Sequence, residues 1–384
     1  MGRKQIQLKD CGTILQYLEE TQAPVWKKYH ANRTCFHVYN ELKTNLAPIT
    51  RDVERGAMAA EINQLLAGYS AKYNSIPIED SKARVQLIEQ IISSDPVILL
   101  NNHGEEHIAM VINRASEIIK HFHGQQLSEF EAFILLCAIE IHDIGNILGR
   151  TGHERNLIEL FDDKSKELIP DTAERRVIKS IAVAHGGKNS SGEKDTISCL
   201  EYSELLFDSR VRTKLLAAIL RFADELADDY TRASRGLLDL NAIGVNSKIY
   251  QDYSRVLHSV VIEPIDNQYD NAVHLVYELE ASDLKEPYYR GDKTLYLIDE
   301  IYERSLKMER ERRYCQKFLN PVVSISRIKV AINIYYSCTE HETISYTLED
   351  HAYPDDPKGS AIKDIIGSSY KSGADYAAKI CKGE

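Results

Sequence analysis

The clearest indication of the fold is the sequence Ala138-Ile139-Glu140-Ile141-His142-Asp143-Ile144-Gly145-Asn146. It continues an apolar run that begins at Phe133, and such a run is typical of a buried helix. A histidine and an aspartate stand side by side at the end of the run, and Gly145 then ends the helix. Ionisable groups in this setting are costly unless a counter-charge compensates them, and a bound cation would do so.

Three other segments each place a histidine or an aspartate on or beside an apolar helical pattern. Upstream lies His103-Gly104-Glu105-Glu106-His107-Ile108-Ala109-Met110-Val111. Downstream lie Ala182–Lys188, which holds His185, and Leu220–Leu226, which holds Asp224. Adjacent residues of a helix point about 100° apart. His142 and Asp143 can therefore bind the same ion only near a helix end or together with ligands from these other segments.

The order His, His-Asp, His, Asp resembles the HD-domain metal-dependent phosphohydrolase superfamily, over roughly residues 102–235. The resemblance implies a helical core that holds a divalent metal ion. The residues that match the metal ligands of the superfamily are His107, His142, Asp143 and Asp224. His185 matches an extra histidine that, in some members, binds a second metal ion or stands beside the phosphate.

His103 competes with His107 for the first ligand position. We prefer His107 because it continues the apolar stripe from Val111 to Ile119, whereas His103 lies in the preceding turn and is a candidate for substrate binding. Histidine and carboxylate together suit Mn, Fe, Zn, Ni or Co and tolerate Mg, so the identity of the metal stays open. An ion with an open coordination position could activate water and polarise a phosphoryl oxygen.

Deoxynucleotide triphosphohydrolases of this superfamily carry catalytic histidines soon after the HD pair. In this chain Asn146 stands where one such histidine is common, and His153 comes slightly later. We interpret His153 as a candidate proton donor to a leaving oxygen, oriented by Glu154; the alternative is a residue that merely starts a helix. The cations that could bind phosphate are Arg150, Arg155, Lys188 and Arg232.

Arg232 lies about two helical turns beyond Asp224, on roughly the same face if that helix continues. A similarly placed arginine binds the phosphate tail in the triphosphohydrolases. Taken singly, each of these cations is more often a solvated surface residue. We also interpret Asp228, Asp229 and the charged run Glu309–Arg313 as solvent-exposed.

The fold class is predicted to be mainly α. We divide the chain into a helical N-terminal extension (1–96), an HD core (97–240), a small α+β appendage (241–340) and a polar C-terminal tail (341–384). In the core, Ser128 with Glu131 predicts a capping box for the central helix, and Asp171 predicts the start of the helix that ends at His185. In the appendage the pattern is β-β-α-β, with strands at 255–262, 272–279 and 325–336 around a helix at 294–318.

Composition narrows the function classes. The formal net charge of −11 argues against broad binding to nucleic acid, which needs a basic surface. The seven cysteines include no C-x-x-C pair, which favours reduced thiols and a cytoplasmic location. No apolar run approaches the length of a membrane span, so no membrane partner is expected.

The leading hypothesis is a metal-dependent phosphohydrolase that acts on a small nucleotide, with deoxynucleoside triphosphates or other nucleotides favoured. The run Ala223–Asp229 and the His103–His107 segment resemble HD proteins of prokaryotic conflict systems, which suggests nucleotide depletion in antiviral defence. Helical flanks are used by oligomeric enzymes of this kind, so we expect a homo-oligomer. A regulatory protein partner is compatible with the sequence.

Two other classes stay open. One is an HD nuclease acting on single-stranded nucleic acid, although no basic stretch interleaved with aromatic residues supports it. The other is a non-catalytic module that senses a nucleotide. A (p)ppGpp hydrolase is disfavoured, because Gly145-Asn146-Ile147 replaces the acidic pair that follows the HD motif in that branch.

Overall fold

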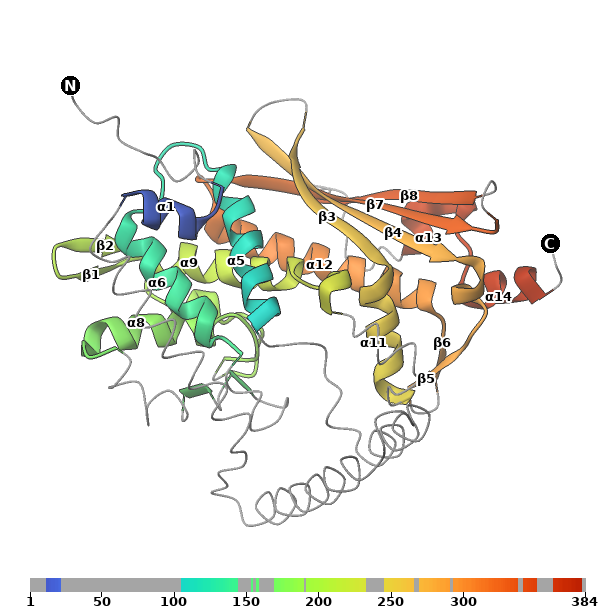
Figure 1. Ribbon diagram of the computed structural model, residues 1–384, viewed down its shortest axis with the longest axis horizontal. Coiled ribbons are helices and arrows are strands. Elements are labelled where there is room, and N and C mark those ends of the chain that lie inside the picture. The colour runs from blue at the N-terminus through green and yellow to red at the C-terminus, as the bar shows by residue number, and fades with distance from the viewer. Residues whose placement is uncertain are drawn as a thin grey trace, which may run out of the picture. The chain divides into compact units, whose positions relative to one another are not determined.

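The computed structural model describes residues 12–21, 105–143, 153–154, 157–158, 169–189, 191–232, 245–265, 269–290, 293–337, 341–350 and 362–381 (Figure 1). These residues form two compact units. The helical unit contains α1 (Ile14–Thr21), α5 (Glu105–Lys120), α6 (Glu129–Ile141), α8 (Thr172–Val183) and α9 (Thr213–Leu226), with residues 314–324. The sheet unit contains α11 (Val245–Val256), strands β3 to β8, most of α12 (Leu297–Leu319), α13 (Ile362–Ile366) and α14 (Gly373–Cys381).

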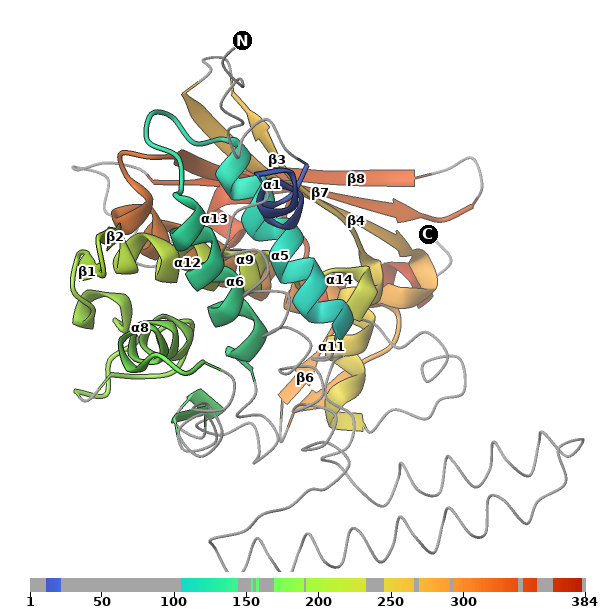
Figure 2. The same ribbon diagram turned by 60° about the vertical axis from the view of Figure 1, so that its left-hand side comes forward.

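The core of the helical unit is α6, whose residues from Glu131 to Ile141 are all buried. A helix that is apolar all round needs neighbours on every side. α5, α8 and α9 all pack against α6, and α5 and α9 pack against each other (Figure 2). This bundle brings the C-terminal ends of α6, α8 and α9 toward the first turn of α5, which places the predicted ligands together.

The predicted helix starts are confirmed. Ser128 and Glu131 form a reciprocal capping box at the start of α6, and Asp171 accepts hydrogen bonds from the first backbone N–H groups of α8. The Glu131 carboxylate also accepts two hydrogen bonds of 2.8 Å from the Arg212 guanidinium, which lies just before α9. Glu131 therefore ties the start of α6 to the start of α9.

The sheet unit is built on a four-stranded sheet in the order β3-β4-β7-β8. β3 (Leu257–Pro264) pairs antiparallel with β4 (Asp270–Glu280), and β7 (Ser324–Tyr335) pairs antiparallel with β8 (His341–Glu349). β5 (Tyr288–Arg290) and β6 (Lys293–Leu295) form a separate ribbon, as do β1 (Glu204–Leu206) and β2 (Ser209–Val211) in the helical unit. The predicted combination of a helical core and a small β-containing region is confirmed.

The β-β-α-β pattern is incomplete, because β8 lies where a polar tail was expected. Ile344, Tyr346 and Leu348 are buried, while the threonine and serine residues between them are exposed. This alternation is the signature of a strand with one buried face. The polar residues of its outer face hid that signal in the sequence. The tail also supplies α13 and α14, and Tyr376 on α14 is fully buried.

Three charged groups that were expected in solvent, Asp229, Glu309 and Arg312, are instead buried. Asp229 and Glu309 are 2% and 4% exposed. Glu309 receives hydrogen bonds of 2.7 and 2.6 Å from the guanidinium of Arg312, which is itself buried. For Glu309 and Arg312 the interpretation as solvated was wrong because two opposite charges three residues apart on a helix can pair with each other and be buried together.

Of the predicted helical N-terminal extension (1–96), only residues 12–21 are described, and they contain the helix α1. The rest of the predicted extension lies outside the described residues. Within the described part of the chain, no helix combines the length and the apolar character that crossing a bilayer requires.

Candidate metal centre

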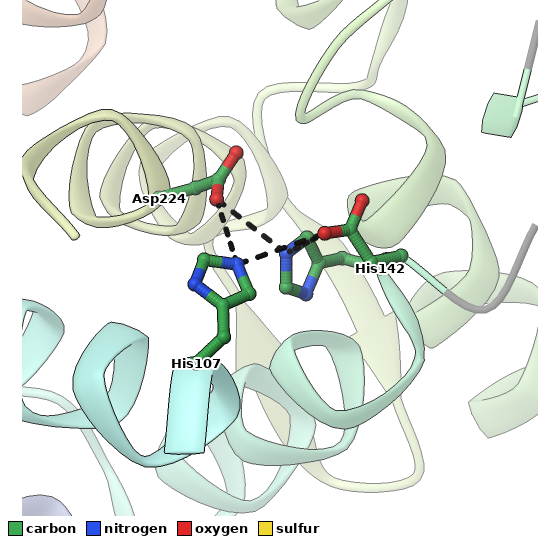
Figure 3. A group of neighbouring side chains, drawn as sticks. His107, His142 and Asp224 are labelled. Atoms are coloured by element: carbon green, nitrogen blue, oxygen red, sulfur yellow. Dashed lines mark ion pairs between the residues drawn. The ribbon is translucent and has the colours of Figure 1, made fainter. Parts of the chain in front are cut away.

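The four residues predicted to bind metal come together in the helical unit. One ligand atom from each of His107, His142, Asp143 and Asp224 lies within 4.8 Å of all the others. The Nε2 atom of His107 is 3.2 Å from Asp224 Oδ1 and 3.6 Å from Asp143 Oδ2. The Nε2 atom of His142 is 3.4 Å from Asp143 Oδ2 and 3.6 Å from Asp224 Oδ1. Figure 3 shows the two imidazoles and the Asp224 carboxylate converging from three helices.

The end of α6 fixes the orientation of the central histidine. His142 is the C-cap of α6, and its Nδ1 lies 2.7 Å from the Ile139 carbonyl oxygen. A carbonyl can only accept, so Nδ1 carries the proton and donates it. The Nε2 lone pair of the neutral ring therefore faces the carboxylates. Such a hydrogen bond at the far nitrogen is the usual way in which proteins orient a histidine that binds metal.

Electrostatics in the group strongly favour a cation. Burial disfavours the charged form of His142, yet Asp143 and Asp224 outweigh it and raise the pKa of the imidazole to about 9. Burial likewise opposes ionisation of Asp224, but hydrogen bonds from His107 and His142 hold the pKa of this carboxyl well below its usual range. The two carboxylates thus hold positive charge at the centre, and a proton on His142 can supply it.

The donor atoms fit a divalent ion. Imidazole nitrogen and carboxylate oxygen bind transition metals at about 2.0–2.2 Å, which places neighbouring donors roughly 3–3.5 Å apart. Of the four separations, 3.2 and 3.4 Å lie within this range and the two of 3.6 Å lie just above it. The buried His142 Nε2 faces the Asp143 and Asp224 carboxylates at 3.4 and 3.6 Å, which is the orientation that a ligand of an ion bound between them needs. Two histidines and two carboxylates form a donor set suited to Mn, Fe, Co, Ni or Zn.

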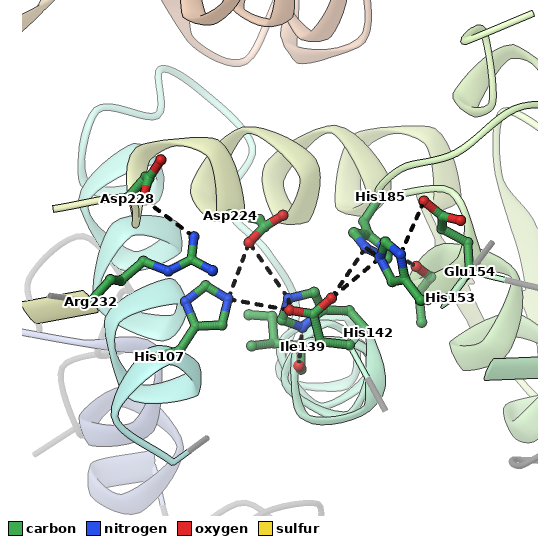
Figure 4. A network of polar contacts seen from close by, with 11 residues as sticks. His107, Ile139, His142, His153, Glu154, His185, Asp224, Asp228 and Arg232 are labelled. Atoms are coloured by element: carbon green, nitrogen blue, oxygen red, sulfur yellow. Dashed lines mark hydrogen bonds and ion pairs between the residues drawn. The ribbon is translucent and has the colours of Figure 1, made fainter. Parts of the chain in front are cut away.

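A second group of donors shares Asp143. The other carboxylate oxygen, Oδ1, lies 3.4 Å from His153 Nε2 and 3.8 Å from His185 Nε2, and the two Nε2 atoms are 3.3 Å apart. These three side chains also meet the geometry of a possible metal site. Figure 4 shows His153 and His185 pointing toward each other. Asp143 therefore presents one oxygen to each group.

His185 repeats the arrangement of His142 at the end of a different helix. It follows the C-cap of α8, and its Nδ1 lies 2.6 Å from the Ala182 carbonyl oxygen, which leaves Nε2 facing Asp143. Burial and the neighbouring His142 together lower the pKa of His185 from 6.5 to about 4. This histidine is consequently neutral near pH 7 and acts as an acceptor at Nε2.

Glu154 lies where the sequence suggested, with Oε1 3.5 Å from His153 Nδ1. Its carboxylate rests against the two glycines that follow His185. A Cβ on Gly187 would come within 2.8 Å of the Glu154 carboxyl carbon, and Gly187 has φ +71°, a conformation that favours glycine. This role of Gly187 was not predicted, although the glycine pair Gly186-Gly187 directly after a helix-end histidine is a signal for it in the sequence.

Of the residues predicted to bind phosphate or substrate, the structure describes only Lys188 and Arg232. Lys188 is exposed on the loop after His185. We expected Arg232 to share a helix face with Asp224, and this was wrong. The helix α9 ends at Leu226, and Arg232 lies in a separate 3-10 turn, Tyr230–Arg232. There its guanidinium forms an ion pair with Asp228 at 3.6 Å. Asp228 is also paired with Arg304, so it is not the solvated residue that we expected. His103, Arg150 and Arg155 lie outside the described residues.

Comparison with known families agrees with this geometry. The family model HD-CE matches residues 94–305, more than half of the chain. The chain belongs to the HD-CE family. The match includes all four residues of the first donor group and all of the second. No curated protein and no solved structure matches the chain.

Proposed function

We propose that this HD-CE protein is a metal-dependent hydrolase that cleaves a phosphate ester or anhydride bond of a small nucleotide. The observation that carries the proposal is the convergence of His107, His142, Asp143 and Asp224 with ligand atoms within 4.8 Å of one another. These residues would hold a divalent ion, which would supply Lewis acidity at a phosphoryl oxygen and an activated water.

The second donor group, Asp143, His153 and His185, could supply a proton to the leaving group beside that ion. His185 is neutral and accepts at Nε2, so His153 can donate from its own Nε2 across the 3.3 Å between them. In our proposal His153 protonates the leaving oxygen, Glu154 orients the His153 ring through Nδ1, and His185 holds the proton donor in place. Binding of a second ion by this group is the alternative, and metal stoichiometry distinguishes the two.

A small nucleotide is the substrate class that we favour. The net charge of −11 opposes a polyanionic chain, whereas a single phosphate tail needs only a few cations. The exposed Lys188 directly follows the His185 loop glycines and could reach such a tail. Among small nucleotides we favour deoxynucleoside triphosphates, with depletion of the nucleotide pool in antiviral defence as the biological role and a homo-oligomer as the working form.

The test is turnover of a nucleotide panel with Mg and Mn in parallel. The panel holds dNTPs, NTPs, monophosphates, cyclic dinucleotides, (p)ppGpp and single-stranded DNA, compared for wild type, Asp143→Ala and the exposed control Asp208→Ala. We expect turnover of a nucleotide by wild type and the control but not by Asp143→Ala, and tripolyphosphate as product would place the attack at the α-phosphate. Cleavage of DNA alone would instead establish a nuclease. Metal binding without any turnover would favour a nucleotide sensor.

A further inference from the structure

A chain of buried hydrogen bonds connects the end of α8 to α9. The Thr196 hydroxyl donates to the Ala184 carbonyl oxygen at 2.7 Å, and the same hydroxyl accepts from the Arg221 Nη1 at 2.9 Å. Ala184 is the C-cap of α8 and directly precedes His185. Arg221 lies on α9, three residues before Asp224. These hydrogen bonds therefore connect the end of α8, next to His185, to the part of α9 that carries Asp224.

The Arg221 guanidinium is a buried cation held on several sides. Its Nη1 also donates to the Lys194 carbonyl oxygen at 3.1 Å, and its Cζ lies 4.5 Å from the centre of the Tyr314 ring. The Tyr314 hydroxyl donates to Asp195 at 2.8 Å and accepts from the Ile197 N–H at 2.8 Å. A buried cation with this many partners has few alternative positions. Arg221 therefore holds Lys194 and Thr196, which follow His185 in the chain, in a fixed position against α9.

The Thr196 contact acts next to the atoms that orient His185. The Ala182 carbonyl accepts both the His185 backbone N–H at 3.3 Å and the His185 Nδ1 at 2.6 Å. This last turn of α8 must keep its shape if the His185 Nε2 is to stay 3.3 Å from His153 and 3.8 Å from Asp143. This link could not be predicted from the sequence, because Thr196 and Arg221 lie in separate segments without a shared motif.

We propose that Thr196 and Arg221 are positioning residues that fix His185 relative to the metal-bearing helix α9. Neither residue is assigned any contact with substrate; they act through the backbone at Ala184. The inference rests on the proposed function for its effect on turnover, but the orientation of His185 can be measured without any substrate.

The deciding variant is Thr196→Val, which keeps the shape of the side chain and removes the hydroxyl. Thr196→Ser is the matched control, because it keeps the hydroxyl. We expect turnover to fall by about 10- to 100-fold in Thr196→Val, since small misplacements of a reacting group have effects of this size, and to stay within about threefold of wild type in Thr196→Ser.

A double-mutant cycle with His185→Gln separates positioning from general destabilisation. If Thr196 acts through His185, then Thr196→Val will cost less than about twofold further turnover in the His185→Gln background. An equal loss in both backgrounds would overturn the proposal, because it would mean that Thr196 supports the fold and not this histidine.

The ring-nitrogen NMR signals of His185, assigned with His185→Gln, provide a readout that is independent of activity. In metal-free wild type and Thr196→Ser we expect a single tautomer protonated at Nδ1, and in Thr196→Val a mixture of tautomers. If wild type hydrolyses nothing in the panel, the proposed function fails while these spectra still decide the positioning role. An unchanged His185 spectrum in Thr196→Val would contradict it.

Discussion

Asp143 is the residue on which the site depends, because each of its oxygens serves a different group. Oδ2 faces His107 and His142, and Oδ1 faces His153 and His185. Its place one residue beyond the C-cap of α6 makes this possible, since a residue at a helix end can turn both oxygens toward neighbouring segments. A metal ion held on one side would then be linked to a proton donor on the other through a single carboxylate.

The two helix-end histidines predict opposite pH effects on the metal-free protein. The pKa of His142 is raised from 6.5 to about 9, so its stabilising contribution is full below pH 6.5 and is lost as the pH rises through 9. The pKa of His185 is lowered from 6.5 to about 4, so the unfolded state takes up its proton first and stability is lost as the pH falls from 6.5 toward 4. We therefore expect the free energy of unfolding from these two groups to peak near pH 6.5.

Urea unfolding from pH 4 to 9.5 in the presence of a chelator measures this effect. Replacement of His142 by Gln should remove most of the loss on the alkaline side, and His185→Gln should remove part of the loss on the acid side. An alkaline limb that is the same in wild type and His142→Gln would show that the carboxylates do not raise the pKa of His142.

At the residue scale, the sequence predicted which four donor residues come together, but it did not predict the residues that hold the neighbouring segments in place. Each of His107, His142 and Asp224 stands in an apolar helical pattern, so its neighbours in sequence indicate its surroundings. Thr196 and Gly187 act on residues from other segments, and no local pattern records such contacts. This difference explains why the four donors could be found before the structure and the positioning residues could not.

At the element scale, the start of α6 is held by one multiply bonded carboxylate. Glu131 closes the capping box with Ser128 and binds Arg212, and its side chain is 3% exposed. A buried pair of this kind is costly to break, because removing one partner leaves an uncompensated charge.

We expect Glu131→Ala to lower the free energy of unfolding by roughly 3–5 kcal/mol, and Ser128→Ala by only about 1 kcal/mol, the usual cost of losing an N-cap. Chemical denaturation of both variants measures the difference. Equal effects would mean that the pair with Arg212 contributes little. The exposed Glu303→Ala serves as the control and should change stability by less than about 0.5 kcal/mol.

Elements with a uniform apolar face were predictable, and those with mixed faces were not. α6 and β7 carry long apolar patterns and were placed to within a few residues. β8 alternates apolar residues with threonine, serine and glutamate, and so it was taken for a polar tail. A strand that completes a sheet is defined by the partner that it pairs with, which a single sequence does not reveal.

At the scale of the whole molecule, the C-terminal segment is part of the sheet unit. β8 pairs with β7 along its length, from Arg327–Glu349 to Tyr335–His341, and buries Ile344, Tyr346 and Leu348. A chain that ends at residue 340 would lose these side chains and expose β7 as an unpaired edge.

We therefore expect this truncation to lower the unfolding temperature by roughly 10 °C or more and to cause association, since each lost core side chain costs about 2–5 kcal/mol. Differential scanning fluorimetry and size-exclusion chromatography measure both effects. A chain that ends at Cys381 is the control and should behave as the full chain. Unchanged stability of the shorter chain would show that β8 is dispensable to the sheet.

The proposed function depends on metal binding by His107, His142, Asp143 and Asp224. Titration calorimetry with Mn, supported by elemental analysis, measures this binding. We predict at least one divalent ion per chain, with affinity reduced by about 100-fold or more in His107→Ala and Asp224→Asn and unchanged in the exposed control Asp208→Asn. Retention of one ion in His153→Ala would place that ion in the first group. A wild type that binds no divalent ion, or an Asp224→Asn variant that binds it as tightly as wild type, would contradict the account.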